Sequence, residues 1–185
     1  MKNKNKFLGI FLRYAILVLA AIPNLWIFYF IFTPLTVYPV FFLIKIFFDA
    51  FLMDNIIVVN NEVPIEIIKA CIAGSAYYLL LILNLSTPNM KFKKRINLIL
   101  ISFALLLTIN VFRILALSVI FLEGFSWFIL THKFFWYFMS TIFVAGIWFA
   151  EVKYFKIKDY PLYSDLKFLY NKSLIKLSRK NLKLS

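Results

Sequence analysis

The sequence predicts an all-α integral membrane protein with about four transmembrane helices, an outer-face interfacial or re-entrant helix and a short extracytoplasmic hairpin. Two observations predict this fold class. Hydrophobic residues make up 63% of the 185 residues and charged residues only 16%, which is more apolar surface than a soluble domain of this length could bury. Most of the 21 basic residues gather in three clusters that flank apolar runs of spanning length, as cytoplasmic loops do under the positive-inside rule.

The three basic clusters lie at the N-terminus, between the middle apolar runs and in the C-terminal segment. Because each cluster adjoins a run long enough to cross a bilayer, the positive charge indicates membrane topology rather than nucleic-acid binding. All three clusters are expected to face the cytoplasm. They consist of Lys2, Lys4, Lys6 and Arg13; Lys91, Lys93, Lys94 and Arg95; and Lys153, Lys156, Lys158, Lys167, Lys172, Lys176, Arg179, Lys180 and Lys183.

The first apolar run covers residues 7–32 and is predicted to be one transmembrane helix. About 20 apolar residues suffice to cross a bilayer, and the run follows a basic start, so it enters from the cytoplasmic side. It exceeds a signal-peptide core in length and no clear small-residue cleavage site follows it, so we expect the segment to be retained. Pro23 is expected to kink the helix.

Residues 36–53 form a shorter apolar segment that contains charges, and the residues after it contain turn-forming asparagines. Residues 54–68 are expected to form two short extended pieces around a turn at Asn60 and Asn61, as a hairpin. The acidic residues of this stretch, Asp54, Glu62 and Glu66, contrast with the basic clusters. We expect both segments on the outer face.

Three further runs, residues 70–85, 96–121 and 132–150, complete the predicted spans. With all basic clusters inside, the run 70–85 must pass from outside to inside, so residues 54–69 lie outside. The run 7–32 already brings the chain outside, so residues 36–53 cannot cross. The alternative is a fifth span with the N-terminus outside, which the basic N-terminus argues against.

The chain is expected to form one membrane-embedded catalytic domain over residues 1–155, followed by a tail over residues 156–185. The tail spaces leucine, isoleucine and phenylalanine among lysines, which is typical of an amphipathic helix on a membrane surface. The predicted location is therefore the cell membrane, with several spans and a cytoplasmic tail.

Three polar groups stand at one predicted depth on three different helices: Cys71, Arg113 with Asn110, and His132. With a rise of about 1.5 Å per residue, each lies roughly 27–32 Å along its helix from a basic residue at the cytoplasmic end. That distance matches a hydrocarbon core of about 30 Å, so all three are expected at the outer boundary. Each has a simpler interpretation: a small packing residue, an arginine reaching the interface, and a residue at a helix end.

Together these residue types permit nucleophilic acyl transfer. A thiolate attacks a carbonyl, an imidazole moves protons, and a guanidinium lowers a thiol pKa or holds an oxyanion. Asn110 shares a helix face with Arg113 and could orient it, and Ser75, four residues after Cys71, could donate a hydrogen bond or allow close helix packing. One histidine and one cysteine do not make a zinc site, and no cofactor or metal is expected.

These residues resemble the exosortase/archaeosortase family of membrane transpeptidases, in its compact archaeal type. Members carry a cysteine entering a membrane helix, an N-x-x-R motif late in the next helix, and a histidine or arginine opening the helix after it. The corresponding stretches here are ACIAGSA with Cys71, NVFRI with Asn110 and Arg113, and THKFF with His132. The resemblance covers residues 33–150. The family often has Cys-Ser/Thr-Gly at the nucleophile, whereas here the glycine, Gly74, comes one position later.

The resemblance implies a membrane thiol protease and transpeptidase that acts in protein sorting. Its partners would be surface-protein precursors that end in a short motif, a membrane helix and a basic tail. The enzyme would cut them at the outer membrane face and release them by hydrolysis or transfer them to a lipid or other amine acceptor. Two alternatives remain open: a non-enzymatic membrane scaffold or transport subunit, and a membrane acyltransferase without proteolysis.

Overall fold

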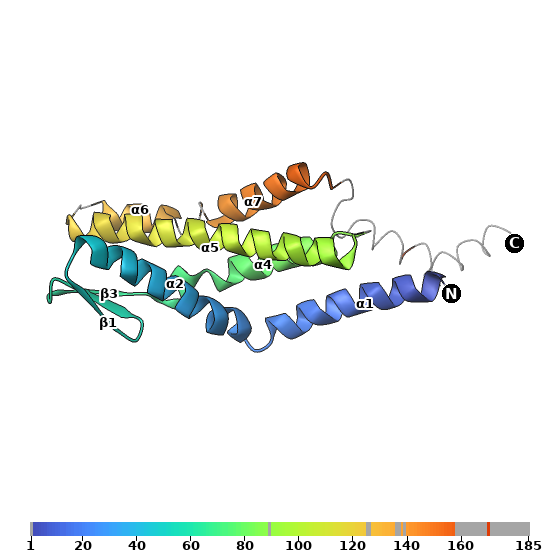
Figure 1. Cartoon of the computed structure of the whole chain (residues 1–185), viewed down its shortest axis with the longest axis horizontal. Helices are drawn as coiled ribbons and strands as arrows, with labels where there is room; N and C mark the ends of the chain where they lie inside the picture. Colours follow the sequence, from blue (N-terminus) through green and yellow to red (C-terminus); the bar gives the residue numbers. More distant parts are fainter. Residues whose placement is uncertain are drawn as a thin grey trace, which may run out of the picture.

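The chain is mostly helical, with a small antiparallel sheet at one end of a helical bundle (Figure 1). The computed structural model describes residues 2–88, 90–124, 127–135, 138, 140–157 and 170. The tail predicted for residues 156–185 therefore lies outside the described residues, except for 156, 157 and 170. The elements are α1 (Lys2–Ala21), α2 (Trp26–Phe47), β1 (Ala50–Met53), β2 (Ile56–Val59), β3 (Val63–Glu66), α3 (Lys69–Ile72), α4 (Gly74–Ser86), α5 (Phe92–Leu122), α6 (Phe128–Phe134) and α7 (Ser140–Tyr154).

The run 7–32, predicted as one kinked span, is divided at Pro23 into α1 and α2. Proline lacks the amide hydrogen and disfavours helical geometry in the residue before it. The next two residues, Asn24 and Leu25, have positive φ angles of 49° and 59°, so the helix ends and a new one begins. The prediction that residues 36–53 form a separate helix, interfacial or re-entrant, was wrong, because α2 continues without interruption from Trp26 to Phe47.

The hairpin predicted around Asn60 and Asn61 is present as β2 and β3, and both asparagines adopt positive φ angles. A third strand, β1, pairs antiparallel with β2, so the sheet order is β1-β2-β3. The all-α assignment was therefore incomplete, and residues 50–53 are a strand rather than the end of a helix. The physical reason is the central strand: Ile57 and Val59 are fully buried, and a strand on each side satisfies its backbone groups.

The run 132–150, predicted as one span, contains the end of α6 and most of α7, and residues 136, 137 and 139 between them lie outside the described residues. In the described part of the chain, three helices are long and apolar enough to cross a membrane. They are Trp26–Phe47, Lys69–Ser86 and Phe92–Leu122.

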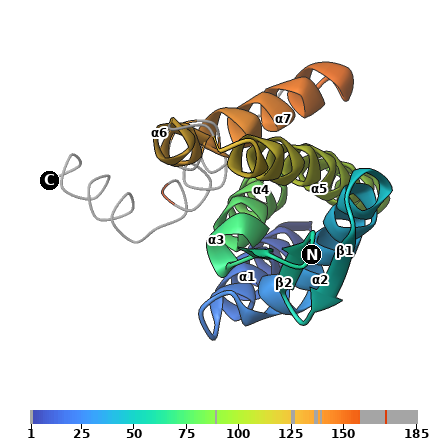
Figure 2. The ribbon, with the colours of Figure 1, turned by 90° about the vertical axis from the view of Figure 1, so that its left-hand side faces the viewer.

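The long helix α5 is the centre of the bundle and packs against α2, α4 and α7 (Figure 2). An aromatic group joins α2, α4 and α5: the ring centroids of Phe32 and Tyr77 lie 3.6 Å apart in a stack, and Phe103 meets both rings edge-on at 5.5 Å. The sheet lies at one end of the bundle, whereas the start of α1 and the basic connection from α4 to α5 lie at the other (Figure 1). The sheet and the basic segments thus lie at opposite ends of the bundle, as expected if they face opposite sides of a membrane. The orientation of the protein in a membrane stays a prediction.

Candidate functional site

Cys71 lies in a one-turn helix that connects the sheet to α4. The extended backbone of β3 leads through Ile67 and Ile68 into α3, where the Cys71 amide donates a 2.8 Å hydrogen bond to the Ile68 carbonyl. At Ala73 the backbone turns left-handed, with φ 59° and ψ 38°, and α4 begins at the next residue. This turn separates Cys71 from the helix that follows it. Glycine is the residue that adopts this conformation without steric cost, and here the position is occupied by alanine.

Close packing beside this turn depends on Gly74. A β-carbon at this position would lie 2.8 Å from Cζ of Tyr29 and 2.9 Å from its Cε1. Glycine therefore lets the start of α4 approach α2 directly. The preceding one-turn helix, α3, contacts α2 and α5.

Two side chains of α5 bind the main chain at the cysteine. Asn110 Nδ2 donates a 2.8 Å hydrogen bond to the Cys71 carbonyl oxygen, and a terminal nitrogen of Arg113 donates a 3.3 Å bond to the same oxygen. The other terminal nitrogen of Arg113 donates a 3.0 Å bond to Oγ of Ser140, at the start of α7. Both side chains are buried, with exposed fractions of 3% for Asn110 and 9% for Arg113. Arg113 therefore links three helices through one guanidinium group.

His132 lies on α6, one turn after an aromatic residue on which its ring rests. The imidazole stacks on Phe128 with ring centroids 5.7 Å apart and an interplanar angle of 12°. The side chain is partly exposed, so it remains accessible from the cavity described next.

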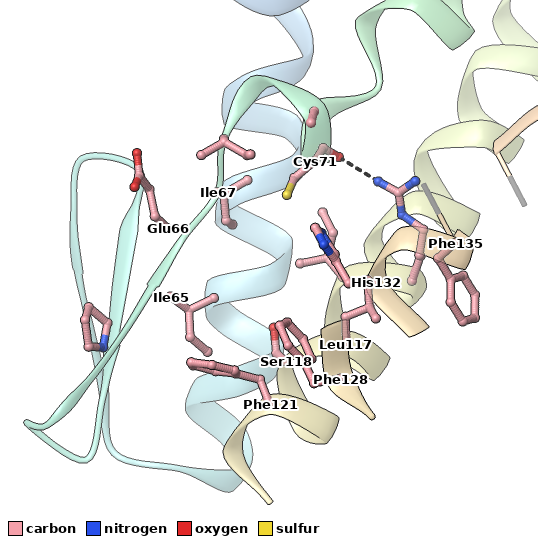
Figure 3. Close-up of a pocket in the computed structure, with 15 residues that line it drawn as sticks. Ile65, Glu66, Ile67, Cys71, Leu117, Ser118, Phe121, Phe128, His132 and Phe135 are labelled. Atoms are coloured by element: carbon pink, nitrogen blue, oxygen red, sulfur yellow. Dashed lines mark hydrogen bonds between the residues drawn. The ribbon is translucent and has the colours of Figure 1, made fainter. Parts of the chain in front are cut away.

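One cavity of about 250 Å³ brings Cys71, Arg113 and His132 together. Cys71 and His132 both line this cavity, and Figure 3 shows the Cys71 sulfur and the His132 ring pointing into it. Most of its lining is apolar. Glu66, at the end of β3, contributes a carboxylate to the lining. Besides the residues named, the lining comprises Pro64, Ile65, Ile67, Ile68, Ala70, Ile114, Leu117, Ser118, Phe121, Phe128 and Phe135.

The predicted site residues thus fall into two groups. Cys71, Arg113 and His132 share the cavity, and Asn110 contacts the backbone of the cysteine. Ser75, expected on the same helix face as the cysteine, does not line this cavity. The left-handed turn at Ala73 interrupts the helix between the two residues, so the four-residue spacing no longer places them together. Ser75 is exposed and lines a separate cavity, which also borders Ser140.

Sequence reasoning missed Ser140 and Phe128. Ser140 accepts the Arg113 hydrogen bond and donates its own, at 3.3 Å, to the Phe135 carbonyl. No spacing rule joins residues 27 positions apart on different helices. Phe128 could have been suspected, since it precedes His132 by four residues, which is the spacing of side-chain neighbours on a helix.

The arrangement supplies a thiol, an imidazole and a nearby cation beside a mostly apolar space. The Arg113 guanidinium donates its hydrogen bond to the carbonyl of Cys71 rather than to the sulfur. Its first role in this arrangement is therefore to hold the cysteine in place. The Nε of Arg113 is buried and has no hydrogen-bond partner in the structure. Within the part of the chain that the structure describes, no three histidine, cysteine, aspartate or glutamate side chains are grouped as a metal site would require.

Comparison of the chain with protein-family models, with curated proteins and with solved structures finds no match.

Proposed function

We propose that this protein is a membrane cysteine protease or transpeptidase that cleaves the C-terminal sorting signal of surface proteins at the outer membrane face. The observation that supports the proposal most strongly is the single cavity lined by Cys71, Arg113 and His132, which come from three different helices. The resemblance of the cysteine, N-x-x-R and histidine stretches to the exosortase/archaeosortase family supports the substrate class.

In the proposed reaction the Cys71 sulfur attacks the carbonyl carbon of the scissile peptide bond. His132 takes the thiol proton and returns it to the nitrogen of the leaving fragment, which carries the membrane helix and the basic tail. The carbon–nitrogen bond breaks and a thioester to Cys71 remains. Water, or an amine on an acceptor such as a lipid, then attacks the thioester, and the thiol is regenerated. Hydrolysis and transfer share every step except this last one.

In this mechanism Arg113 and Asn110 are positioning residues. Both donate hydrogen bonds to the Cys71 carbonyl, so they fix the turn that presents the sulfur to the cavity. Arg113 also places a positive charge beside the cavity. Holding the nucleophile in an attacking geometry is a recognised source of rate enhancement.

The test is processing of a co-expressed precursor by the variants Cys71→Ala, Cys71→Ser and His132→Ala. We expect each variant to accumulate in the membrane at the wild-type level and to leave the precursor intact. Ser75→Ala is the matched control, because Ser75 is exposed and does not line the cavity, and it should process normally. Full processing by Cys71→Ala would eliminate the mechanism.

A non-enzymatic scaffold or transport subunit is the second candidate. It is favoured by the hydrogen bonds of Arg113 and Asn110, which go to the main chain, as those of purely structural residues do. The Cys71→Ser variant separates the two functions, because serine preserves packing and seldom replaces a thiolate. A scaffold would keep its cellular role in this variant, and an enzyme would lose it.

A further inference from the structure

The cavity follows β3 and the two residues that come after it. Residues 64–68 all line it without a gap. Successive side chains of a strand point to opposite faces, so a cavity that contacted one face would be lined by alternate residues. An unbroken series indicates that the cavity runs along the backbone edge of the strand. Figure 3 shows this strand leading directly into the turn that carries Cys71.

This edge has no strand partner in the described part of the chain. In the order β1-β2-β3, the strand β3 pairs with β2 on one side only. The register of the two strands shows which backbone groups of β3 are not hydrogen-bonded to β2. Ile67 donates to the Asn55 carbonyl, so residues 63, 65 and 67 are the positions bonded to β2. The intervening positions, Pro64 and Glu66, direct their backbone groups toward the free edge.

The free edge therefore presents a specific set of groups. Glu66 offers both an amide hydrogen and a carbonyl, and Pro64 offers a carbonyl alone because proline has no amide hydrogen. An extended peptide could accept a hydrogen bond from the Glu66 amide and donate one to the Glu66 carbonyl. It could donate one further hydrogen bond to the Pro64 carbonyl. A proline on an edge strand also limits pairing with other sheets, so the edge accepts a short segment rather than a long strand.

We propose that β3 binds the extended segment of the substrate, just before its membrane helix, as an added antiparallel or parallel strand beside Cys71. The inference rests on the proposed function and names the recognition mode of the same site. Three observations favour an extended peptide over other occupants: the unpaired edge, its continuity with the cysteine turn, and a cavity of about 250 Å³. This volume lies just below the range of about 300–1,000 Å³ for ligand pockets, which suits a few residues rather than a helix.

Main-chain recognition can be tested by removing one amide hydrogen. Glu66→Pro deletes the amide that faces the free edge and keeps the bonds of β3 to β2, and the same strand already has proline two residues earlier. We expect processing of the precursor to fall about 3- to 10-fold, the effect of one hydrogen bond. Glu62→Ala changes an exposed acidic residue that does not line the cavity, so it should stay within about twofold of wild type. Thermal melting of the purified variants checks that both fold.

Docking can be measured without catalysis by disulfide crosslinking. Cys71 is the chain's one cysteine, so Cys71→Ala is a cysteine-free background. Glu66→Cys is introduced there, and single cysteines are placed at successive positions of the precursor before its membrane helix. Strand addition predicts crosslinks at every second position, whereas a docked helix would give a spacing of three or four. Met53→Cys, on the exposed opposite strand β1, should give none.

The outcomes separate this inference from the proposed function. Crosslinks with a period of two, together with slower processing by Glu66→Pro, support both. Normal processing by Glu66→Pro without crosslinks to residue 66 overturns the strand inference and leaves the protease. Crosslinks in the absence of any processing by the wild-type protein would support peptide binding at β3 and overturn the proposed protease function. Absence of both crosslinking and processing overturns both.

Discussion

Replacing Arg113 with lysine keeps the positive charge but removes the forked pair of donors. In the structure one terminal nitrogen binds the Cys71 carbonyl at 3.3 Å and the other binds Ser140 Oγ at 3.0 Å. A lysine ammonium is a single point on a flexible stem and reaches at most one of these acceptors. A hydrogen bond from a charged donor contributes about 1.5–3 kcal/mol, and about 1.4 kcal/mol corresponds to a tenfold change in rate. Processing by Arg113→Lys should therefore fall roughly 10- to 150-fold.

The assay is the rate at which the precursor loses its tail in membranes containing equal amounts of each variant. Ser140→Ala is the matched control: it removes one acceptor and leaves the bond to Cys71, so its loss should be smaller than that of Arg113→Lys. Thermal stability of both proteins in detergent is measured in parallel. If Arg113→Lys processes the precursor within twofold of wild type, the forked contact does not position the cysteine and our reasoning is wrong.

Three further predictions concern the packing that supports the site, and all can be measured by thermal or denaturant unfolding. Glu151 and Asn84 are buried and joined by a 3.2 Å hydrogen bond, while Oε1 of the first and Oδ1 of the second have no partner in the structure. Glu151→Gln supplies an amide donor and should leave the free energy of unfolding unchanged or raise it, whereas Glu151→Leu should lower it by about 0.6–1.7 kcal/mol. Equal stabilities of the two variants would contradict this reasoning. Gly74→Ala should destabilise the protein through contact with Tyr29, and Tyr29→Ala should suppress that loss; additive effects would show that the contact is unimportant. Ala73→Gly should stabilise by about 0.5–1 kcal/mol, because residue 73 has a positive φ, and a loss of stability would refute that.

The grouping of three candidate residues could be predicted from helix geometry. A constant rise per residue and alternating direction predict Cys71, Arg113 and His132 at the same end of their helices, and in the structure the three line one cavity. The target of Arg113 could not be predicted in the same way. The guanidinium binds the backbone carbonyl of Cys71, and this carbonyl is available because the helix breaks at Ala73. An alanine gives no sequence signal for a left-handed turn.

The fold was less well predicted where composition is uniform. Residues on both sides of residue 36 are equally apolar, so hydropathy could not show that α2 continues from Trp26 to Phe47. Pro23 was expected to kink a helix, and the structure shows a complete break. The strand β1 depends on pairing with β2, a tertiary interaction that overrides the helical appearance of residues 50–53.

The most direct test of the proposed function is the mass of a co-expressed precursor that ends in a membrane helix and a basic tail. It is measured in cells with the wild-type protein and in cells with Cys71→Ala. We expect loss of the tail only with the wild type. A new C-terminus carrying the mass of water would indicate hydrolysis, and a larger added mass would identify the acceptor. Precursors that remain intact with a folded wild-type protein, or that are cut equally with Cys71→Ala, would contradict a cysteine-dependent protease.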